Sequence, residues 1–140
     1  MRHVRMAVPA LATVALLFLG VSCGGDDDGD GGEESEAPLS EAGERGKTTA
    51  ASSGCAACHG ADGQGGVGPG WVGLAGSQVE LADGTFVVAD DAYLDRAIRD
   101  PAAEIRAGYN LRMPTNGLSD DEIADVIAYI HDLSPATRDE

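Results

Sequence analysis

The sequence predicts one small, mostly α-helical domain with a short β-hairpin, placed behind an N-terminal export segment. Three observations predict this fold class. Residues 119–135 repeat apolar positions with a helical period behind a capping signal, residues 90–100 form a second capped helical stretch, and residues 79–88 are two β-rich arms around a turn. The chain has 140 residues, enough for one domain plus targeting, and contains no internal repeat.

The N-terminus has the pattern of an export signal. Residues 1–5 are a short basic start, and residues 6–21 are an apolar run too short to cross a bilayer comfortably. The run ends in LFLGVSC, which resembles the lipobox of bacterial lipoproteins, although Gly20 stands where leucine is usual. The resemblance implies removal of residues 1–22 as a signal peptide and lipidation of Cys23, with attachment to the periplasmic or extracellular face of a bacterial membrane. An ordinary signal peptide and an uncleaved anchor helix are the alternatives.

Residues 23–40 are predicted to form a disordered, acidic tether between Cys23 and a folded domain at 41–140. Glycine and acidic residues dominate this stretch, which cannot bury enough apolar surface to offset its ordering entropy. The whole chain has 9 basic and 24 acidic residues and a formal net charge of −15. This charge argues against nucleic acid and anionic lipid surfaces as partners and favours a partner with a basic surface.

The folded domain is predicted to begin with a helix over residues 41–53, capped by Ser40. Gly43 and Gly46 are poor helix formers, and their presence makes sense if another helix crosses closely there. Residues 59–76 contain eight glycines, which suits a backbone that presses against a large flat object.

A hairpin and a second helix follow. Residues 79–88 predict two strands joined by a two-residue turn at Asp83 and Gly84. Residues 90–100 predict a helix that begins behind Asp90 as N-cap.

After an irregular stretch at 102–117, the last helix is the clearest element. Ser119 and Glu122 match a capping box at the start of residues 119–135. One apolar stripe is expected to face the core: Ile123, Val126, Ile127 and Ile130. Few other large apolar residues lie in 41–140, so the domain looks short of core material, and a large apolar cofactor would fill the gap.

The stretch SGCAACHG holds Cys55 and Cys58, with His59 directly after them. A zinc site lacks further ligands, a redox dithiol lacks a βαβ context, and a bare disulfide leaves the histidine unexplained. C-x-x-C-H is the attachment sequence of haem c, so the pattern predicts one covalent haem held by both thiols, with His59 as proximal iron ligand.

The second axial ligand must come from elsewhere in the chain. After signal removal Met113 is the one methionine left, and it lies in a polar stretch before a proline, 113 − 59 = 54 residues past the histidine. A lone methionine more often packs in a core. His131, on the last helix, is the competing ligand.

These motifs together resemble a class I c-type cytochrome. The segments GCAACHG, GPGW, DDAYLDRAIRDP and AGYNLRMPTNGLSDDEIADVIAYIHDL carry the resemblance over about residues 42–134. They are most similar to the cytochrome c domain fused to subunit II of some haem–copper oxidases, a group in which the hairpin also occurs. The chain carries no dinuclear copper segment and no preceding transmembrane hairpin, so a stand-alone protein is expected.

The resemblance implies three to four helices around a covalent haem, with the first and last helices crossing near Gly46. It assigns His59 and Met113 as axial iron ligands and gives the carbonyl of Pro69 the role of orienting the histidine. The implied function is that of a lipid-tethered carrier of single electrons, not an enzyme. It would work in a respiratory chain, between a quinol–cytochrome c reductase and a terminal oxidase. The alternatives are a fixed subunit of a larger oxidase or dehydrogenase, and an enzyme or gas sensor in which Met113 leaves the iron.

Overall fold

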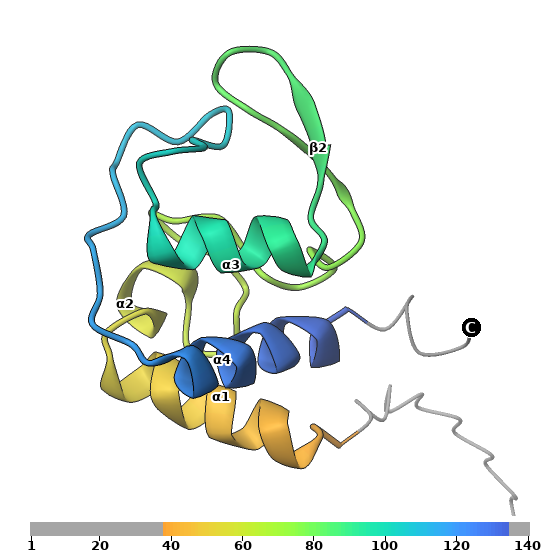
Figure 1. Ribbon diagram of the computed structural model, residues 1–140, viewed down its shortest axis with the longest axis vertical. Helices are drawn as coiled ribbons and strands as arrows, with labels where there is room; N and C mark the ends of the chain where they lie inside the picture. Colours follow the sequence, from red (N-terminus) through yellow and green to blue (C-terminus); the bar gives the residue numbers. More distant parts are fainter. Residues whose placement is uncertain (1–37, 135–140) are drawn as a thin grey trace, which may run out of the picture. The chain divides into compact units, whose positions relative to one another are not determined.

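The computed structural model describes residues 38–134. The predicted export signal, Cys23 and all but the last three residues of the predicted tether lie outside the described residues. Four helices and one two-stranded antiparallel sheet make up the described part (Figure 1). They are α1 (Glu41–Ser52), α2 (Ala56–His59), β1 (Gln78–Glu80), β2 (Phe86–Val88), α3 (Asp91–Arg99) and α4 (Asp120–Asp132). The expected fold class, a mostly helical domain with a small hairpin, is confirmed.

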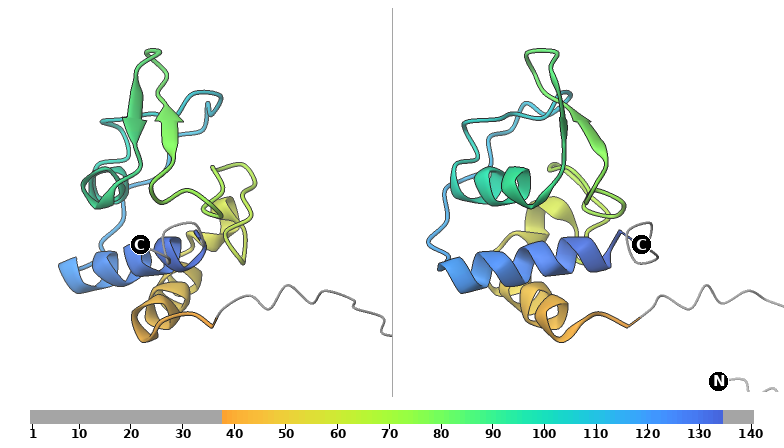
Figure 2. Two further views of the ribbon diagram at one scale, coloured as in Figure 1. Left: turned by 90° about the vertical axis from the view of Figure 1, so that its right-hand side faces the viewer. Right: turned by 45° about the vertical axis from the view of Figure 1, so that its right-hand side comes forward.

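Helices α1 and α4 pack against each other and cross at Gly46 (Figure 2). A Cβ atom at Gly46 would collide with the backbone carbonyl of Asp125 on α4, so only glycine permits this approach. The guanidinium of Arg45 donates two hydrogen bonds to the Asp125 carboxylate, at 2.9 and 2.7 Å, and holds its pKa below the usual range. The predicted crossing near Gly46 is confirmed.

Helix α4 begins as the sequence predicts. The Ser119 hydroxyl accepts from the backbone N–H of Glu122, and the Glu122 carboxylate accepts from the backbone N–H of Ser119 at 2.8 Å. The buried face is shifted from the predicted stripe: Tyr129 is 1% exposed, whereas Ile127 is only half-buried. Helix α3 also packs against α4, and its own N-cap is Asp90, as predicted.

The hairpin lies on the far side of α3 from α4 (Figures 1 and 2). Its turn is one residue longer than predicted: the N–H of Leu81 donates to the carbonyl of Thr85 at 2.8 Å, which leaves three residues in the loop. Gly84 has φ of +83°, the left-handed conformation that such three-residue loops need. The Asp-Gly pair was therefore recognised as a turn, but the two-residue loop was wrong.

The glycine-rich stretch packs largely against the chain itself. A Cβ atom at Gly68 would lie 3.1 Å from Cε1 of His59, and one at Gly66 would lie 2.9 Å from the carbonyl oxygen of Cys58. These glycines therefore allow the loop to fold closely around the residues that follow the two cysteines, a reason that the flat-object argument missed. None of the helices within residues 38–134 is long and apolar enough to cross a membrane.

Candidate functional site

The CxxCH motif forms its own short helix at the end of α1. Cys55 is the N-cap of α2, and the backbone N–H of His59 donates to the carbonyl of Cys55 at 3.0 Å. This single turn brings Cys55 and Cys58 to the same cavity. Both are free thiols and partly exposed, and burial raises the pKa of Cys55.

His59 is 7% exposed, and its ring is held from several sides. Its Nδ1 lies 2.7 Å from the carbonyl oxygen of Pro69. Because a carbonyl can only accept, Nδ1 carries the proton and donates, which leaves Nε2 with a free lone pair. Trp71 stacks on the ring with centroids 4.7 Å apart and planes 20° apart. Burial lowers the pKa of His59, with the Pro69 contact acting against it, which favours the neutral ring.

A cavity of about 440 Å³ opens beside these residues. A smaller cavity of about 120 Å³ adjoins it, and the two share five lining residues. The shared residues are His59, Pro69, Leu111, Arg112 and Met113. The larger cavity is therefore lined by every predicted site residue of the folded domain: Cys55, Cys58, His59, Pro69 and Met113. Met113 reaches this cavity from a segment 54 residues after the histidine.

The segment that carries Met113 is held at both ends. At its start, the N–H of Ala82 donates to the carbonyl of Ile105 at 2.7 Å, and the N–H of Ala107 donates to the carbonyl of Glu80 at 2.8 Å. The hairpin thereby fixes residues 105–107. At its end, the Asn116 amide donates to the backbone carbonyl of Ile98 at 2.7 Å.

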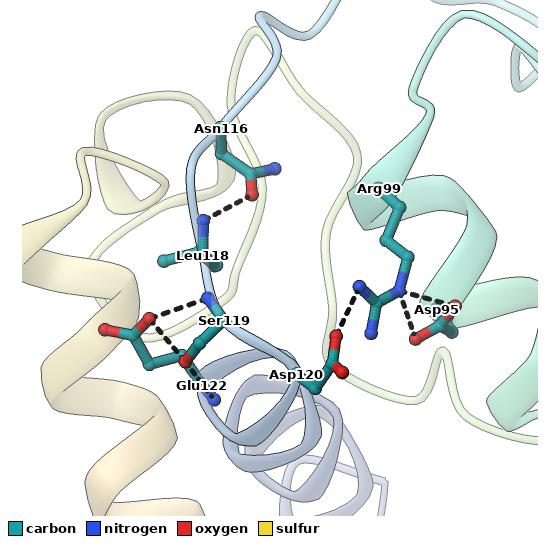
Figure 3. A network of polar contacts seen from close by, with 7 residues as sticks. All are labelled: Asp95, Arg99, Asn116, Leu118, Ser119, Asp120 and Glu122. Carbon is teal, nitrogen blue, oxygen red and sulfur yellow. Dashed lines mark hydrogen bonds and ion pairs between the residues drawn. The ribbon is translucent and has the colours of Figure 1, made fainter.

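Asn116 is the central contact at that second end. Its side-chain oxygen also accepts from the N–H of Leu118 at 3.2 Å (Figure 3). Beside it, Arg99 on α3 pairs with Asp120 on α4 at 2.8 Å and with Asp95 on its own helix at 2.9 Å (Figure 3). These contacts tie the end of the Met113 segment and the start of α4 to the last turn of α3.

Two arginines that line the cavities have no carboxylate partner in the described part of the chain. Each of the other four basic residues in the described part makes an ion pair with a carboxylate: Arg45, Lys47, Arg96 and Arg99. No carboxylate lies within ion-pair distance of Arg106 or Arg112 among residues 38–134. Arg106 instead lies over the Tyr109 ring, at 5.9 Å from its centroid. The cavity walls thus combine mostly apolar side chains with two arginines that form no ion pair among the described residues.

His131, the competing ligand candidate, lies away from this space. It lines neither cavity, and its Nε2 contacts the Asp91 carboxylate at 2.6 Å. Within the described part of the chain, no three His, Cys, Asp or Glu side chains gather as a possible metal site.

Sequence reasoning missed four residues of the site: Trp71, Arg106, Arg112 and Asn116. The tryptophan stands two residues after Pro69, and the asparagine stands three residues after Met113, so both lay next to recognised motifs. Arg112 directly precedes Met113, but its sequence position does not show what distinguishes it and Arg106, namely the lack of a carboxylate partner among the described residues.

The comparison with protein families agrees with this geometry. The family model described as Cytochrome c matches residues 43–134, from the third residue of α1 to just past the end of α4. No curated protein matches the chain. The CxxCH spacing of Cys55 and Cys58 is that of covalent haem c attachment, and the family is one of haem-based electron carriers with redox protein partners. The chain therefore belongs to the cytochrome c family and carries haem c for electron transfer.

Proposed function

We propose that this protein is a membrane-tethered carrier of single electrons whose iron has His59 and Met113 as its axial ligands. Cys55 and Cys58 would hold the haem through thioether bonds, and Pro69 would orient the histidine. The observation that carries the proposal is the meeting of His59 and Met113 at one cavity, since both side chains line it from distant parts of the sequence. When both axial positions are filled, iron has no open site for a substrate, which suits electron transfer.

The residues present fit a haem group. Two thiols lie at the cavity, His59 offers Nε2 because Nδ1 is already engaged, and the walls are mostly apolar. Arg106 and Arg112 would pair with the carboxylates of haem, which would explain why they have no carboxylate partner among residues 38–134. Bound haem supplies a one-electron iron couple, whose potential a methionine ligand raises.

The proposed tether consists of lipidated Cys23 and the acidic segment that follows it. A flexible segment of about 17 residues spans roughly 20–25 Å on average and keeps the domain near membrane partners at raised effective concentration. We propose electron delivery from a quinol–cytochrome c reductase toward a terminal oxidase. Cys23→Ser should release the protein from the membrane fraction or block its processing. An unmodified Cys23 in the mature protein by mass spectrometry would refute the lipid anchor.

The ligand assignment is tested with Met113→Ala in the haem-loaded protein. The native ferric protein should show the weak near-infrared band of sulfur–iron charge transfer and should not bind carbon monoxide in the ferrous state. Met113→Ala should lose the band, bind carbon monoxide and lower the reduction potential. Asn110→Ala is the matched control, because it truncates an exposed side chain in the same segment that lines neither cavity, and it should retain the band. A native protein without the band that binds carbon monoxide readily would overturn the carrier role in favour of a sensor or catalyst.

A further inference from the structure

The contact between Trp71 and His59 is unlike the other described aromatic contact in the core. Trp71 meets Tyr129 edge-on, with planes 86° apart and centroids 6.0 Å apart, which is ordinary aromatic packing. It meets His59 nearly face to face, with planes 20° apart and centroids 4.7 Å apart. Of the three rings, His59 lines both cavities, Trp71 lines the smaller one, and Tyr129 lines neither.

Trp71 itself is held rigidly. It is 7% exposed, and its backbone N–H donates to the carbonyl of Gly63 at 2.7 Å. Gly63 packs so closely that a Cβ atom there would lie 3.2 Å from Cβ of Trp71. The Tyr129 ring, which meets Trp71 edge-on, comes from α4, the helix that crosses α1. The indole therefore acts as a fixed wall and not as a side chain that adapts to its neighbour.

The hydrogen bond of His59 does not fix its ring by itself. Acceptance by a carbonyl oxygen has a broad angular distribution, so a ring held only through Nδ1 can still turn about the N–H···O line. A flat indole on one face blocks that rotation. The Gly68 backbone closes the Cε1 edge, where an added Cβ would lie 3.1 Å away. The three contacts together leave Nε2 with a single direction into the cavity.

We propose that Trp71 is a positioning residue that sets the plane of the His59 imidazole and lowers the reduction potential of the site. The inference rests on the proposed role of His59 as an iron ligand. An iron-bound imidazole carries more positive charge in the oxidised state, and an indole face attracts positive charge within about 6 Å of the ring centroid. Trp71 therefore favours the oxidised state, and its loss raises the potential.

The test compares Trp71→Leu, Trp71→Phe and Val79→Ala in the haem-loaded protein. Leucine keeps an apolar side chain without a π face, and phenylalanine keeps a smaller face. Val79 is 1% exposed, lies on β1 and lines neither cavity, so its truncation lowers stability without removing a cavity-lining side chain. The readouts are the reduction potential and the hyperfine-shifted haem methyl resonances of the ferric protein, which report the orientation of axial ligand planes.

Trp71→Leu should raise the potential and rearrange the methyl shifts, and Trp71→Phe should lie between Trp71→Leu and the native protein. Val79→Ala should lower thermal stability and leave both readouts at native values. Native shifts and potential in Trp71→Leu, with only lower stability, would overturn the inference and leave Trp71 as core packing. If Trp71→Leu does not mature, native values in Trp71→Phe have the same meaning. Failure of the proposed function is separate, because it removes the sulfur–iron band from the native protein itself.

Discussion

Replacing Asn116 with alanine should loosen the segment that carries Met113. The amide of Asn116 donates to the carbonyl of Ile98 at 2.7 Å and accepts from the N–H of Leu118 at 3.2 Å. Between Tyr109 and Asn116 no backbone N–H of the described chain makes a backbone hydrogen bond, so the side chain of Asn116 is the nearest polar anchor after Met113. Its loss frees the end of the segment from α3.

The magnitude follows from the half-buried setting of Asn116. A net hydrogen bond contributes about 0.5–1.5 kcal/mol, and leaving a buried partner unsatisfied costs about 1–3 kcal/mol. A loss of about 1–3 kcal/mol multiplies the open population of the segment by about 5- to 140-fold, since each 1.4 kcal/mol is tenfold. An external ligand that competes with Met113 should gain apparent affinity by the same factor.

The assay is an imidazole titration of the ferric, haem-loaded protein, followed through the sulfur–iron band. Asn116→Asp separates the two bonds, because a carboxylate can still accept from Leu118 but cannot donate to Ile98. Asn116→Asp should raise the imidazole affinity at least as much as Asn116→Ala does, because neither variant can donate to the Ile98 carbonyl. Arg99→Met is the control: the Arg99 guanidinium is 41% exposed and its pairs with Asp95 and Asp120 are screened by water, so a small change is expected. An unchanged imidazole affinity in Asn116→Ala would refute the anchoring argument.

Three further predictions concern attachment, packing and pH. Cys55→Ala with Cys58→Ala should abolish haem that survives denaturing electrophoresis, and covalent haem in that double variant would contradict thioether attachment. Gly46→Val should destabilise the domain by more than about 3 kcal/mol or prevent folding, because its side chain meets the backbone of α4 and neither can yield; an unaltered denaturant midpoint would argue against the close crossing. The Ser119 contacts hold the pKa of Glu122 below its usual range, so its contribution is present above that range and lost as pH falls through the lowered pKa. Glu122→Gln should therefore show a shallower loss of stability in acid, and parallel profiles would contradict this.

The elements found from sequence are those whose cause is local. The capping box needs a serine and a glutamate three positions apart, and both partners of its reciprocal hydrogen bonds lie in that short stretch. The cysteine pair and His59 likewise share one turn. Gly46 was recognised because glycine is unfavourable inside a helix unless another backbone lies close. The sequence therefore indicated a helix crossing at Gly46, but not which residue of the other helix lies there.

The remaining features depend on partners that sequence order hides. Asn116 binds a carbonyl 18 residues earlier, and Arg45 pairs with Asp125, 80 residues later. Pairing of this kind also decides which cations stay free, so the special status of Arg106 and Arg112 appears only in three dimensions. The length of the hairpin loop was missed because Asp-Gly suits both a two-residue turn and a three-residue loop that ends in a left-handed glycine.

The two halves of the proposed iron site are held with unequal firmness. His59 follows α1, which packs on α4 through a glycine crossing, and its ring is enclosed by Trp71, Pro69 and Gly68. The Met113 segment instead lies between two anchors and makes no regular secondary structure between them. Local opening costs least where buried contacts are few and backbone hydrogen bonds are sparse. Opening should therefore release Met113 before His59, which makes the methionine side the first to respond to a competing ligand, to Asn116→Ala or to mild denaturant.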